Sequence, residues 1–229
     1  MNLYKENEKA VRGSIASQCN PSQFALFYGA LLGDGCLSKV GKHHYFISIV
    51  GHLVDDYEFI STIIHPIMEF LVLKKIKIRK SNKECKCEIV ICNKKLFFRL
   101  NEIGFPIGKK GAKLDIPSSF SRDECKYLIQ GYFATDGCLV LTNNNGILYP
   151  RIEFSGISKP LLKKVLVYLR SVGMKGKLYV KREYPNSSWN TIFRLQFNGK
   201  KNLECFRNQI GFINPKHNKK YNNWKRARG

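Results

Sequence analysis

The sequence predicts an α+β fold made of two tandem αββαββα repeats related by pseudo-two-fold symmetry. Two observations predict it: an ordered series of matches between the two halves of the 229-residue chain, and the same succession of helical and strand patterns in each half. Apolar residues make up 44% of the chain, which is enough for a packed core in each half.

The repetition is clearest around a tetrapeptide, Asp-Gly-Cys-Leu, which occurs at 34–37 and again at 136–139. Its surroundings match as well, because Phe-Tyr-Gly-Ala-Leu-Leu-Gly-Asp-Gly at 27–35 aligns with Ile-Gln-Gly-Tyr-Phe-Ala-Thr-Asp-Gly at 129–137. Further matches pair 47–51 with 152–156 and 101–105 with 208–212. An ordered series of this kind indicates an internal duplication, with a first repeat over 21–107 and a second over 122–213.

Each repeat is predicted to begin with a helix that ends at the Asp-Gly pair. Pro21-Ser22-Gln23 is a helix-start signal, and Ser121 followed by Glu124 resembles a capping box. The elements expected next in the first repeat are strands at 36–40 and 44–50, a helix at 54–71, strands at 74–80 and 86–92, and a helix at 94–103. In the second repeat they are strands at 138–142 and 149–155, a helix at 158–172, strands at 177–182 and 190–197, and a helix at 200–210.

Three segments lie outside the repeats. Residues 1–20 are predicted to be an N-terminal extension, and 108–121 a basic linker. Residues 214–229 form a basic C-terminal tail that contains no acid. We expect this tail to stay loose until it meets a phosphate backbone, and the sequence leaves open whether Trp224 docks on the core.

The charge of the chain points to a polyanionic partner. Lys and Arg number 39 against 17 Asp and Glu, a formal net charge of +22. No segment is apolar enough to span a membrane, and the N-terminus lacks the apolar core of a signal peptide, so we expect a protein of the cytoplasm or of an organelle matrix, without a membrane partner. The eight cysteines lack the spacing of a zinc site and are expected to be reduced.

Strand period two places much of this charge on one face of each predicted sheet. Basic and apolar residues alternate, so that one face is rich in Lys, Arg, Gln and Asn, side chains that contact phosphates and bases. An ordinary solvated face is the alternative. The candidate DNA-contacting residues are Lys75, Lys77, Arg79, Arg151, Glu153, Lys177, Tyr179, Lys181, Arg194 and Gln196.

The first helix of each repeat carries small residues and ends in an acid. Gly29 with Gly33, and Gly131 with Ala134, would let the two helices pack closely, which brings Asp34 and Asp136 together. Two carboxylates at helix C-termini oppose both helix dipoles, and divalent cations such as Mg²⁺ would relieve this. Beside a phosphodiester, such a site would suit hydrolysis of both strands of a duplex. The alternative is that Asp-Gly is only a turn between helix and strand.

These residues resemble the two LAGLIDADG motifs of the single-chain homing endonucleases, over roughly 21–213. The resemblance implies a monomer whose antiparallel sheets form a saddle over the DNA major groove, and a metal-dependent enzyme that cuts both strands of a long, asymmetric site and leaves short 3′ overhangs. It implies Asp34 and Asp136 as metal ligands and catalytic residues, helped by the carbonyls of Gly33 and Thr135. Mg²⁺ is the expected cofactor, with Mn²⁺ able to substitute and Ca²⁺ binding without cleavage.

The resemblance also implies basic residues near the scissile phosphates. The linker lysines Lys109, Lys110 and Lys113 and the tail lysines Lys216, Lys219 and Lys220 hold comparable places, and we select Lys113 and Lys220 as catalytic candidates. A solvated run of phosphate contacts explains these lysines equally well. His52 follows Gly51, where some relatives carry a polar active-site side chain, and we expect it to be a surface histidine.

Some proteins of this family are RNA maturases, which bind intron RNA and assist its splicing. The presence of both acids favours the nuclease, and one protein with both activities stays open. A non-catalytic regulator would be expected to lack the acids. An intein-embedded form is not expected, because no splicing segments flank the repeats.

Overall fold

The computed structural model describes residues 20–185 and 187–227, so most of the predicted extension 1–20 lies outside the described residues. By its contacts the chain divides into two units, each described here by itself. One contains the described residues up to Lys110 together with Ile116–Thr135, and the other contains Gly111–Asp115 and the described residues from Asp136 onward.

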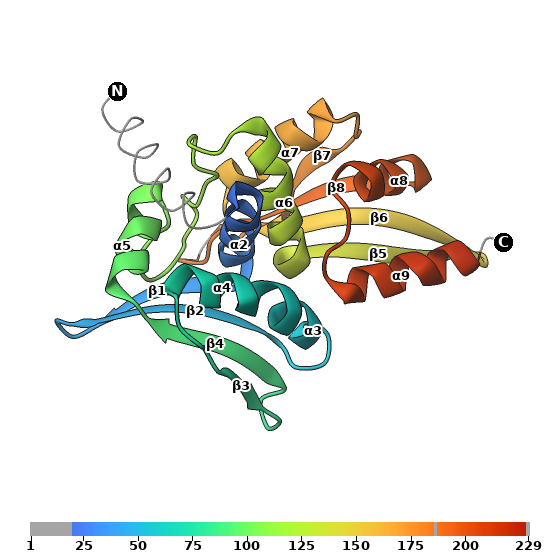
Figure 1. The fold of residues 1–229 in the computed structure, drawn as a ribbon. Helices are drawn as coiled ribbons and strands as arrows, with labels where there is room; N and C mark the ends of the chain where they lie inside the picture. Colours follow the sequence, from blue (N-terminus) through green and yellow to red (C-terminus); the bar gives the residue numbers. More distant parts are fainter. Residues whose placement is uncertain (1–19, 186, 228–229) are drawn as a thin grey trace. The chain divides into compact units, whose positions relative to one another are not determined.

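Both repeats have the predicted αββαββα order, and each contributes one four-stranded antiparallel sheet (Figure 1). The first sheet has the strand order β1-β2-β4-β3 and the second the equivalent order β5-β6-β8-β7. The first-repeat elements are α2 (Pro21–Asp34), β1 (Gly35–Val40), β2 (His44–His52), α3 (Tyr57–Phe59), α4 (His65–Val72), β3 (Ile78–Ser81), β4 (Lys86–Cys92) and α5 (Lys94–Ile103). The second-repeat elements are α6 (Arg122–Asp136), β5 (Gly137–Asn144), β6 (Ile147–Gly156), α7 (Lys159–Ser171), β7 (Lys177–Arg182), β8 (Ile192–Asn198) and α8 (Lys200–Gln209).

The first helix of each repeat begins with a side-chain cap. The Asn20 side chain accepts a 2.9 Å hydrogen bond from the Ser22 N–H, and Pro21 occupies the first turn of α2. The predicted capping box is confirmed at α6, where the Ser121 N–H donates to the Glu124 carboxylate at 2.8 Å and the Glu124 N–H donates to the Ser121 hydroxyl at 3.4 Å. Almost the whole of α2, from Phe24 to Gly33, is buried.

The predicted helix at 54–71 is a composite. A π-helical turn at Ile60–Ile64 joins α3 to α4. Pro66 follows this turn and lacks the N–H that an α-helix would direct to the preceding turn, which favours the wider winding. α4 ends at Val72, and its C-cap is Leu73, a non-glycine residue with a left-handed φ of 52°.

The prediction of a strand at 74–80 is wrong in its first half, because β3 begins only at Ile78. Lys75 and Lys77 therefore lie before the strand rather than on its face. The physical reason lies at Ile76, whose N–H donates to the Glu69 carboxylate at 2.8 Å and whose carbonyl lies 2.8 Å from Nε2 of His65. Side chains of α4 thus satisfy the backbone groups that a strand would have paired.

The prediction of a loose C-terminal tail is also wrong over most of its length. Residues Pro215–Arg226 form an additional helix, α9, which packs along β5 in the second unit (Figure 1). Asn214 caps it, and His217, Tyr221 and Trp224 are buried along one stripe of the helix. Trp224 is only 2% exposed, and its indole N–H donates to the Leu148 carbonyl at 3.1 Å, so this residue docks on the fold.

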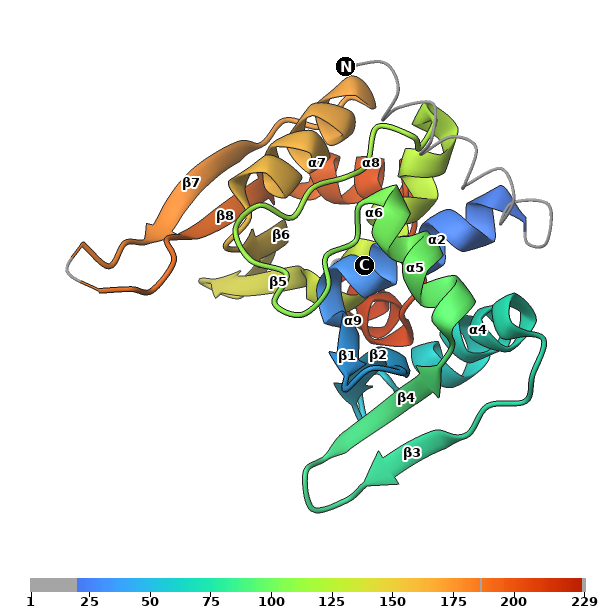
Figure 2. The same cartoon turned by 90° about the vertical axis from the view of Figure 1, so that its left-hand side faces the viewer.

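Each sheet has a helix-covered face and a face that carries its polar residues. In the second unit α7 contacts β6, β7 and β8, while α8 contacts β6 and β8. Ile152, Phe154, Leu195 and Phe197 are completely buried on this side. The β7–β8 hairpin extends beyond α7 (Figure 2), and Val180 near its outer end is 51% exposed, which departs from the alternation predicted for that strand.

None of the helices in the described part of the chain is long and apolar enough to cross a membrane.

Candidate functional site: two acid-terminated helices and two basic sheet faces

The two motif helices pack against one another through glycine, as the small residues predicted. A Cβ atom added to Gly29 of α2 would overlap the Leu128 carbonyl oxygen of α6. A Cβ atom added to Gly131 of α6 would in turn overlap the Leu26 carbonyl oxygen of α2. The contact is reciprocal, because the alignment that equates Gly29 with Gly131 also equates Leu26 with Leu128. This close approach lies within the first unit.

Each of these helices ends in the acid of its motif. Asp34 is the last residue of α2 and is half-buried, and Asp136 is the last residue of α6 and is exposed. Gly35 and Gly137 follow directly and begin the first strand of each sheet. The acids are therefore fixed between a buried helix and the edge of a sheet in both repeats.

The residues before the acids differ in their surroundings. The Gly33 carbonyl accepts a hydrogen bond from the Lys110 ammonium group. The Thr135 hydroxyl donates within its own helix, to the Tyr132 carbonyl at 3.0 Å and the Gly131 carbonyl at 3.4 Å. The Thr135 side chain is thus directed back along α6.

Lys110 is the linker lysine that reaches a motif helix. Its ammonium group donates to the Leu32 carbonyl at 2.9 Å and lies 3.4 Å from the Leu31 carbonyl, besides its contact with Gly33. These carbonyls belong to the last turn of α2, where the helix dipole favours a cation. Lys110 was one of three linker lysines considered from the sequence, whereas the selected Lys113 is exposed and Lys220 is exposed on α9.

On the polar face of the second sheet, a single carboxylate organises three neighbouring side chains. Glu153 accepts a 2.6 Å hydrogen bond from Gln196, its direct partner across β6 and β8. Nε of Arg151 lies 2.9 Å from the same carboxylate, and Nε of Arg194 lies 4.0 Å from it. All four were predicted to share this face, and the register confirms that they do. Lys177, Tyr179 and Lys181 are exposed on the neighbouring strand β7.

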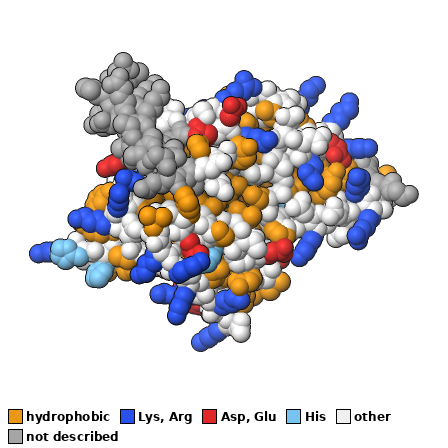
Figure 3. Space-filling view, viewed as in Figure 1, with side chains coloured by type: hydrophobic (Ala, Val, Ile, Leu, Met, Phe, Trp, Pro, Cys, Tyr) orange, Lys and Arg blue, Asp and Glu red, His pale blue; other side chains and the backbone are white. Residues whose placement is uncertain are grey.

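The first sheet has a comparable arrangement around Glu88. Arg79 lies opposite Glu88 in the β3–β4 register, with 3.9 Å between guanidinium and carboxylate, and the Lys86 ammonium lies 3.8 Å from Glu88. The Lys75 ammonium group instead lies 3.3 Å from the carboxylate of Glu69 on α4. The surface view shows Lys and Arg side chains far outnumbering Asp and Glu on the visible face (Figure 3).

Asp34 and Asp136 are hard oxygen donors of the kind that Mg²⁺ prefers. Among the described residues there is no group of three or more His, Cys, Asp or Glu side chains that could hold a metal ion by themselves. A cation at a motif acid would therefore need further oxygen donors, such as backbone carbonyls, water or the phosphates of a substrate.

Comparisons with known proteins match the second repeat of this chain and most of its length. The model of the LAGLIDADG-like domain matches residues 123–211, the second repeat. Two curated relatives are described as probable translation initiation factor IF-2, from Methanocaldococcus jannaschii (26% identical over 197 residues) and Thermococcus kodakarensis (25% over 195). Each match covers 82% of this chain but only 15% and 14% of the relative, so the chain spans about a seventh of these proteins.

Solved structures extend the likeness to both repeats. I-DmoI in complex with DNA and Ca has a TM-score of 0.59 at 20% identity, with 83% of this chain and 89% of that chain covered. The LAGLIDADG meganuclease I-AabMI bound to uncleaved DNA has a TM-score of 0.55 at 16% identity, with 87% of each chain covered. At such identities the likeness shows that the chain has the fold of these proteins.

Proposed function

We propose that this chain is a two-repeat protein of the LAGLIDADG family and, on this basis, a site-specific, divalent-metal-dependent endonuclease that cuts both strands of DNA. One observation of the molecule carries the proposal. The two motif helices pack through Gly29 and Gly131, and each ends in an acid that leads directly into a sheet with a basic face. A helix–helix seam with an acid at the end of each helix suits one carboxylate for each strand of a duplex.

In this proposal Asp34 and Asp136 each hold a divalent cation, Mg²⁺ by preference, with Mn²⁺ able to substitute and Ca²⁺ binding without cleavage. When bound, the cation activates water and neutralises charge on the phosphodiester. Asp34 supplies a half-buried carboxylate of the kind that such an ion prefers, whereas the Gly33 carbonyl accepts a hydrogen bond from the Lys110 ammonium group and would have to leave it to bind the ion. Two solved neighbours described with Ca and with Mn support divalent cation use.

Lys110 has a different task from the acids. Its ammonium group is held at the C-terminal end of α2 by carbonyl oxygens, so it provides a positive charge next to Asp34. We propose that it neutralises negative charge that develops on the phosphate in the transition state. For this role Lys110 replaces Lys113 as the lysine of first choice in the linker, and Lys220 is retained as a candidate phosphate contact.

The polar sheet faces are proposed to bind a long, asymmetric DNA duplex, with the cuts leaving short 3′ overhangs. Basic side chains contact phosphates, and Gln196 with the two arginines around Glu153 can contact base edges. The two faces are not alike, because Glu88 has Arg79 and Lys86 beside it whereas Glu153 has Arg151, Arg194 and Gln196, which suits an asymmetric site read by a monomer. The maturase alternative is not favoured, because the solved neighbours are described as bound to DNA.

The test combines site discovery with matched acid variants. The protein is incubated with a randomised plasmid pool and Mg²⁺, and the broken ends are sequenced; recurrent ends with short 3′ overhangs are expected. Asp34→Asn and Asp136→Asn should each abolish double-strand cleavage while DNA binding is largely retained. Asp123→Asn is the matched control, since Asp123 is an exposed acid at the opposite end of α6. Full cleavage by the Asp34→Asn, Asp136→Asn double variant would overturn the proposal.

A further inference from the structure

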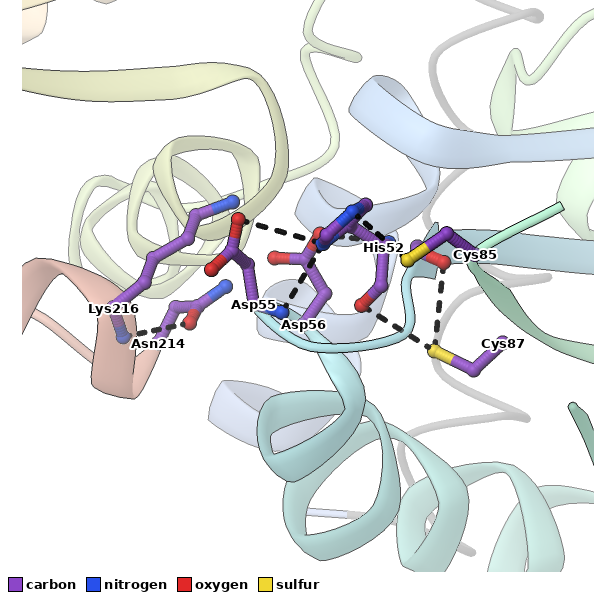
Figure 4. Close-up of polar contacts among 8 residues, drawn as sticks. His52, Asp55, Asp56, Cys85, Cys87, Asn214 and Lys216 are labelled. Atoms are coloured by element: carbon purple, nitrogen blue, oxygen red, sulfur yellow. Dashed lines mark hydrogen bonds and ion pairs between the residues drawn. The ribbon is translucent and has the colours of Figure 1, made fainter. Parts of the chain in front are cut away.

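A cluster of Cys85, His52 and Asp55 lies at one end of the first sheet, and neither the acids nor the basic faces account for it (Figure 4). The Cys85 sulfur lies 3.3 Å from Nε2 of His52. On the other side of the ring, Nδ1 of His52 lies 3.4 Å from the Asp55 carboxylate and accepts a hydrogen bond from the Asp55 N–H at 3.3 Å. We propose that Cys85 is an activated thiol and the site at which this protein is oxidised by hydroperoxides.

Cys85, His52 and Asp55 follow one another as a nucleophile, the base beside it and a third residue that orients the base. If the ring proton is on Nδ1 and faces the Asp55 carboxylate, Nε2 can accept the Cys85 proton. If Nδ1 instead accepts the Asp55 N–H, the ring proton is on Nε2 and is donated to the Cys85 sulfur. The first arrangement places His52 as the base for the Cys85 thiol, whose thiolate is the reactive form.

The backbone holds these three residues in place. His52 ends β2, and its N–H donates to the Asp56 carboxylate at 3.0 Å, while the Asp56 N–H donates back to the His52 carbonyl at 2.9 Å. Cys85 closes the turn between β3 and β4 with a left-handed φ of 48°, and its carbonyl accepts the Leu53 N–H at 2.9 Å. The thiol is therefore presented to the ring by a fixed turn rather than by a mobile side chain.

The cluster is open to solvent, in contrast to its neighbour Cys87. The His52 side chain is 49% exposed and that of Asp55 is 61% exposed, and Cys85 is half-buried. Cys87 is fully buried, its thiol donates to the Gly51 carbonyl at 3.5 Å, and burial raises the pKa of this thiol. Two cysteines only two positions apart thus have opposite expected reactivity.

The proposed reaction balances with a hydroperoxide as the oxidant. With the ring proton on Nδ1, the Cys85 proton passes to Nε2 of His52, and the thiolate attacks one peroxide oxygen. A sulfur–oxygen bond forms as the oxygen–oxygen bond breaks, so that sulfur is oxidised to the sulfenic acid and the peroxide is reduced. The departing hydroxide or alkoxide takes the proton from the His52 imidazolium and leaves as water or an alcohol.

The site lies on the polar face of the first sheet. His52 is the direct partner of Lys86 across β2 and β4, so the two side chains share a face, whereas the adjoining pair of Gly51 and Cys87 faces the core. Oxidation at Cys85 is thus a chemical change on a face that carries Lys86, Glu88 and Arg79. The reactivity itself does not depend on the proposed nuclease function.

The experiment compares Cys85 with Cys92, a thiol that is exposed at the end of β4. The reduced full chain is treated with dilute hydrogen peroxide, sulfenic acid is trapped with dimedone, and the labelled peptides are quantified by mass spectrometry. Trypsin cleavage after Lys86 separates Cys85 from Cys87 and Cys92. Cys85 should be labelled at least about tenfold faster than Cys92, since positioned acid–base groups commonly contribute factors of this size or more.

Two variants make the proposal falsifiable. His52→Ala should lower the Cys85 rate to that of Cys92 and leave Cys92 unchanged, while continued protection of Cys87 from iodoacetamide shows that the hairpin is intact. If His52→Ala exposes Cys87, Asp55→Asn serves instead, because it keeps the size of the side chain but removes the charge that orients the ring. Equal labelling of Cys85 and Cys92 in the unaltered protein, or an unchanged Cys85 rate in the variant that keeps Cys87 protected, would overturn the proposal.

Discussion

The Lys110 ammonium group donates a 2.9 Å hydrogen bond to the Leu32 carbonyl, and so places a linker residue on the last turn of the first motif helix. The Leu31 and Gly33 carbonyls lie around the same ammonium group. Three carbonyl oxygens of the last turn of α2 thus surround one ammonium group close to Asp34, where the helix dipole favours a cation. This contact connects the linker to the end of α2, which its composition alone did not predict.

We expect Lys110→Met to reduce the cleavage rate at saturating DNA by about 10²-fold or more, because one electrostatic stabiliser of the transition state would be lost. DNA affinity should change little, since only one of many basic residues is removed. Single-turnover cleavage and equilibrium binding measure the two effects separately.

Lys109→Met is the matched control for this change, because Lys109 is the exposed neighbour in the same linker. It should leave cleavage close to that of the unaltered protein. Equal losses for the two variants would show that Lys110 acts only through general charge and not through its place at the end of α2.

The glycine contact between α2 and α6 predicts a strong stability effect. Gly131→Ala would force a methyl group into the Leu26 carbonyl, and the helices would have to separate. Overpacking of this kind costs about 1–3 kcal/mol or more in unfolding free energy, despite the better helix propensity of alanine. Urea unfolding followed by circular dichroism measures it.

Gly41→Ala is the control for this prediction. Gly41 has a φ of +60° and open space around its Cα, so its substitution tests backbone strain without a clash and should cost about 1–2 kcal/mol. An unchanged or raised stability of Gly131→Ala would contradict the close approach of the two helices.

Much of the fold could be predicted because the duplication tests each element twice. The pattern of α2, β1 and β2 recurs in α6, β5 and β6, so a weak signal in one repeat is supported by its equivalent in the other. The start of β3 at Ile78, later than predicted, could not be inferred from the duplication. It depends on the hydrogen bonds of the Glu69 and His65 side chains to the backbone of Ile76. The alternation of polar and apolar residues in the sequence does not predict such contacts.

The sequence singles out the two acids, whose role stays a prediction, but it does not single out one lysine. Asp34 and Asp136 stand out as repeated acids, but three lysines lie within 109–113 and their spacing does not say which one reaches α2. The tail helix did leave a signal, because His217, Tyr221 and Trp224 are spaced four and three residues apart, as on one face of a helix. The run of basic residues around them favoured the interpretation as a loose tail.

The Glu153 carboxylate predicts how charge affects DNA binding. Glu153→Gln should strengthen non-specific binding, because the arginines at 151 and 194 lose the negative charge between them. If the protein neutralises ~6–10 phosphates, its log–log salt slope is roughly −5 to −9, and the variant should be steeper by about 1. Affinity for a random duplex over a salt series measures the slope.

Glu183→Gln provides the comparison. Glu183 is exposed just after β7, and its substitution removes the same formal charge from the chain as Glu153→Gln does. It should change the slope less than Glu153→Gln. A flat salt dependence of the unaltered protein would show that the basic faces do not bind the phosphate backbone.

Glu69 predicts a dependence of stability on pH. The Ile76 backbone N–H, followed by the Lys75 and His65 charges, lowers the pKa of this carboxyl below its ordinary value. A lowered folded-state pKa gives stability that is present above the unfolded-state value of about 4.3 and is lost as pH falls through the folded-state pKa. The difference in Tm between the protein and Glu69→Gln should therefore be largest near neutral pH and shrink below pH ~4.

Glu58→Gln is the control, because Glu58 is an exposed acid on α3 in the same helical segment. Its effect on Tm should be small and nearly independent of pH. A constant difference between the protein and Glu69→Gln across the acid range would show that Glu69 does not hold the segment before β3 by its charge.

The burial of Trp224 indicates that the terminal helix α9 is part of the folded unit. Trp224→Ala removes a buried indole and its hydrogen bond to Leu148, and should lower the unfolding free energy by about 3–5 kcal/mol. Lys225→Ala changes the next residue, which is exposed, and its unfolding free energy should stay within about 0.5 kcal/mol of that of the unaltered protein.

Hydrogen exchange should show the β5 amides opening more readily in Trp224→Ala only, because α9 packs along that strand. If both variants unfold at the same denaturant concentration as the unaltered protein, α9 contributes basic charge but no stability.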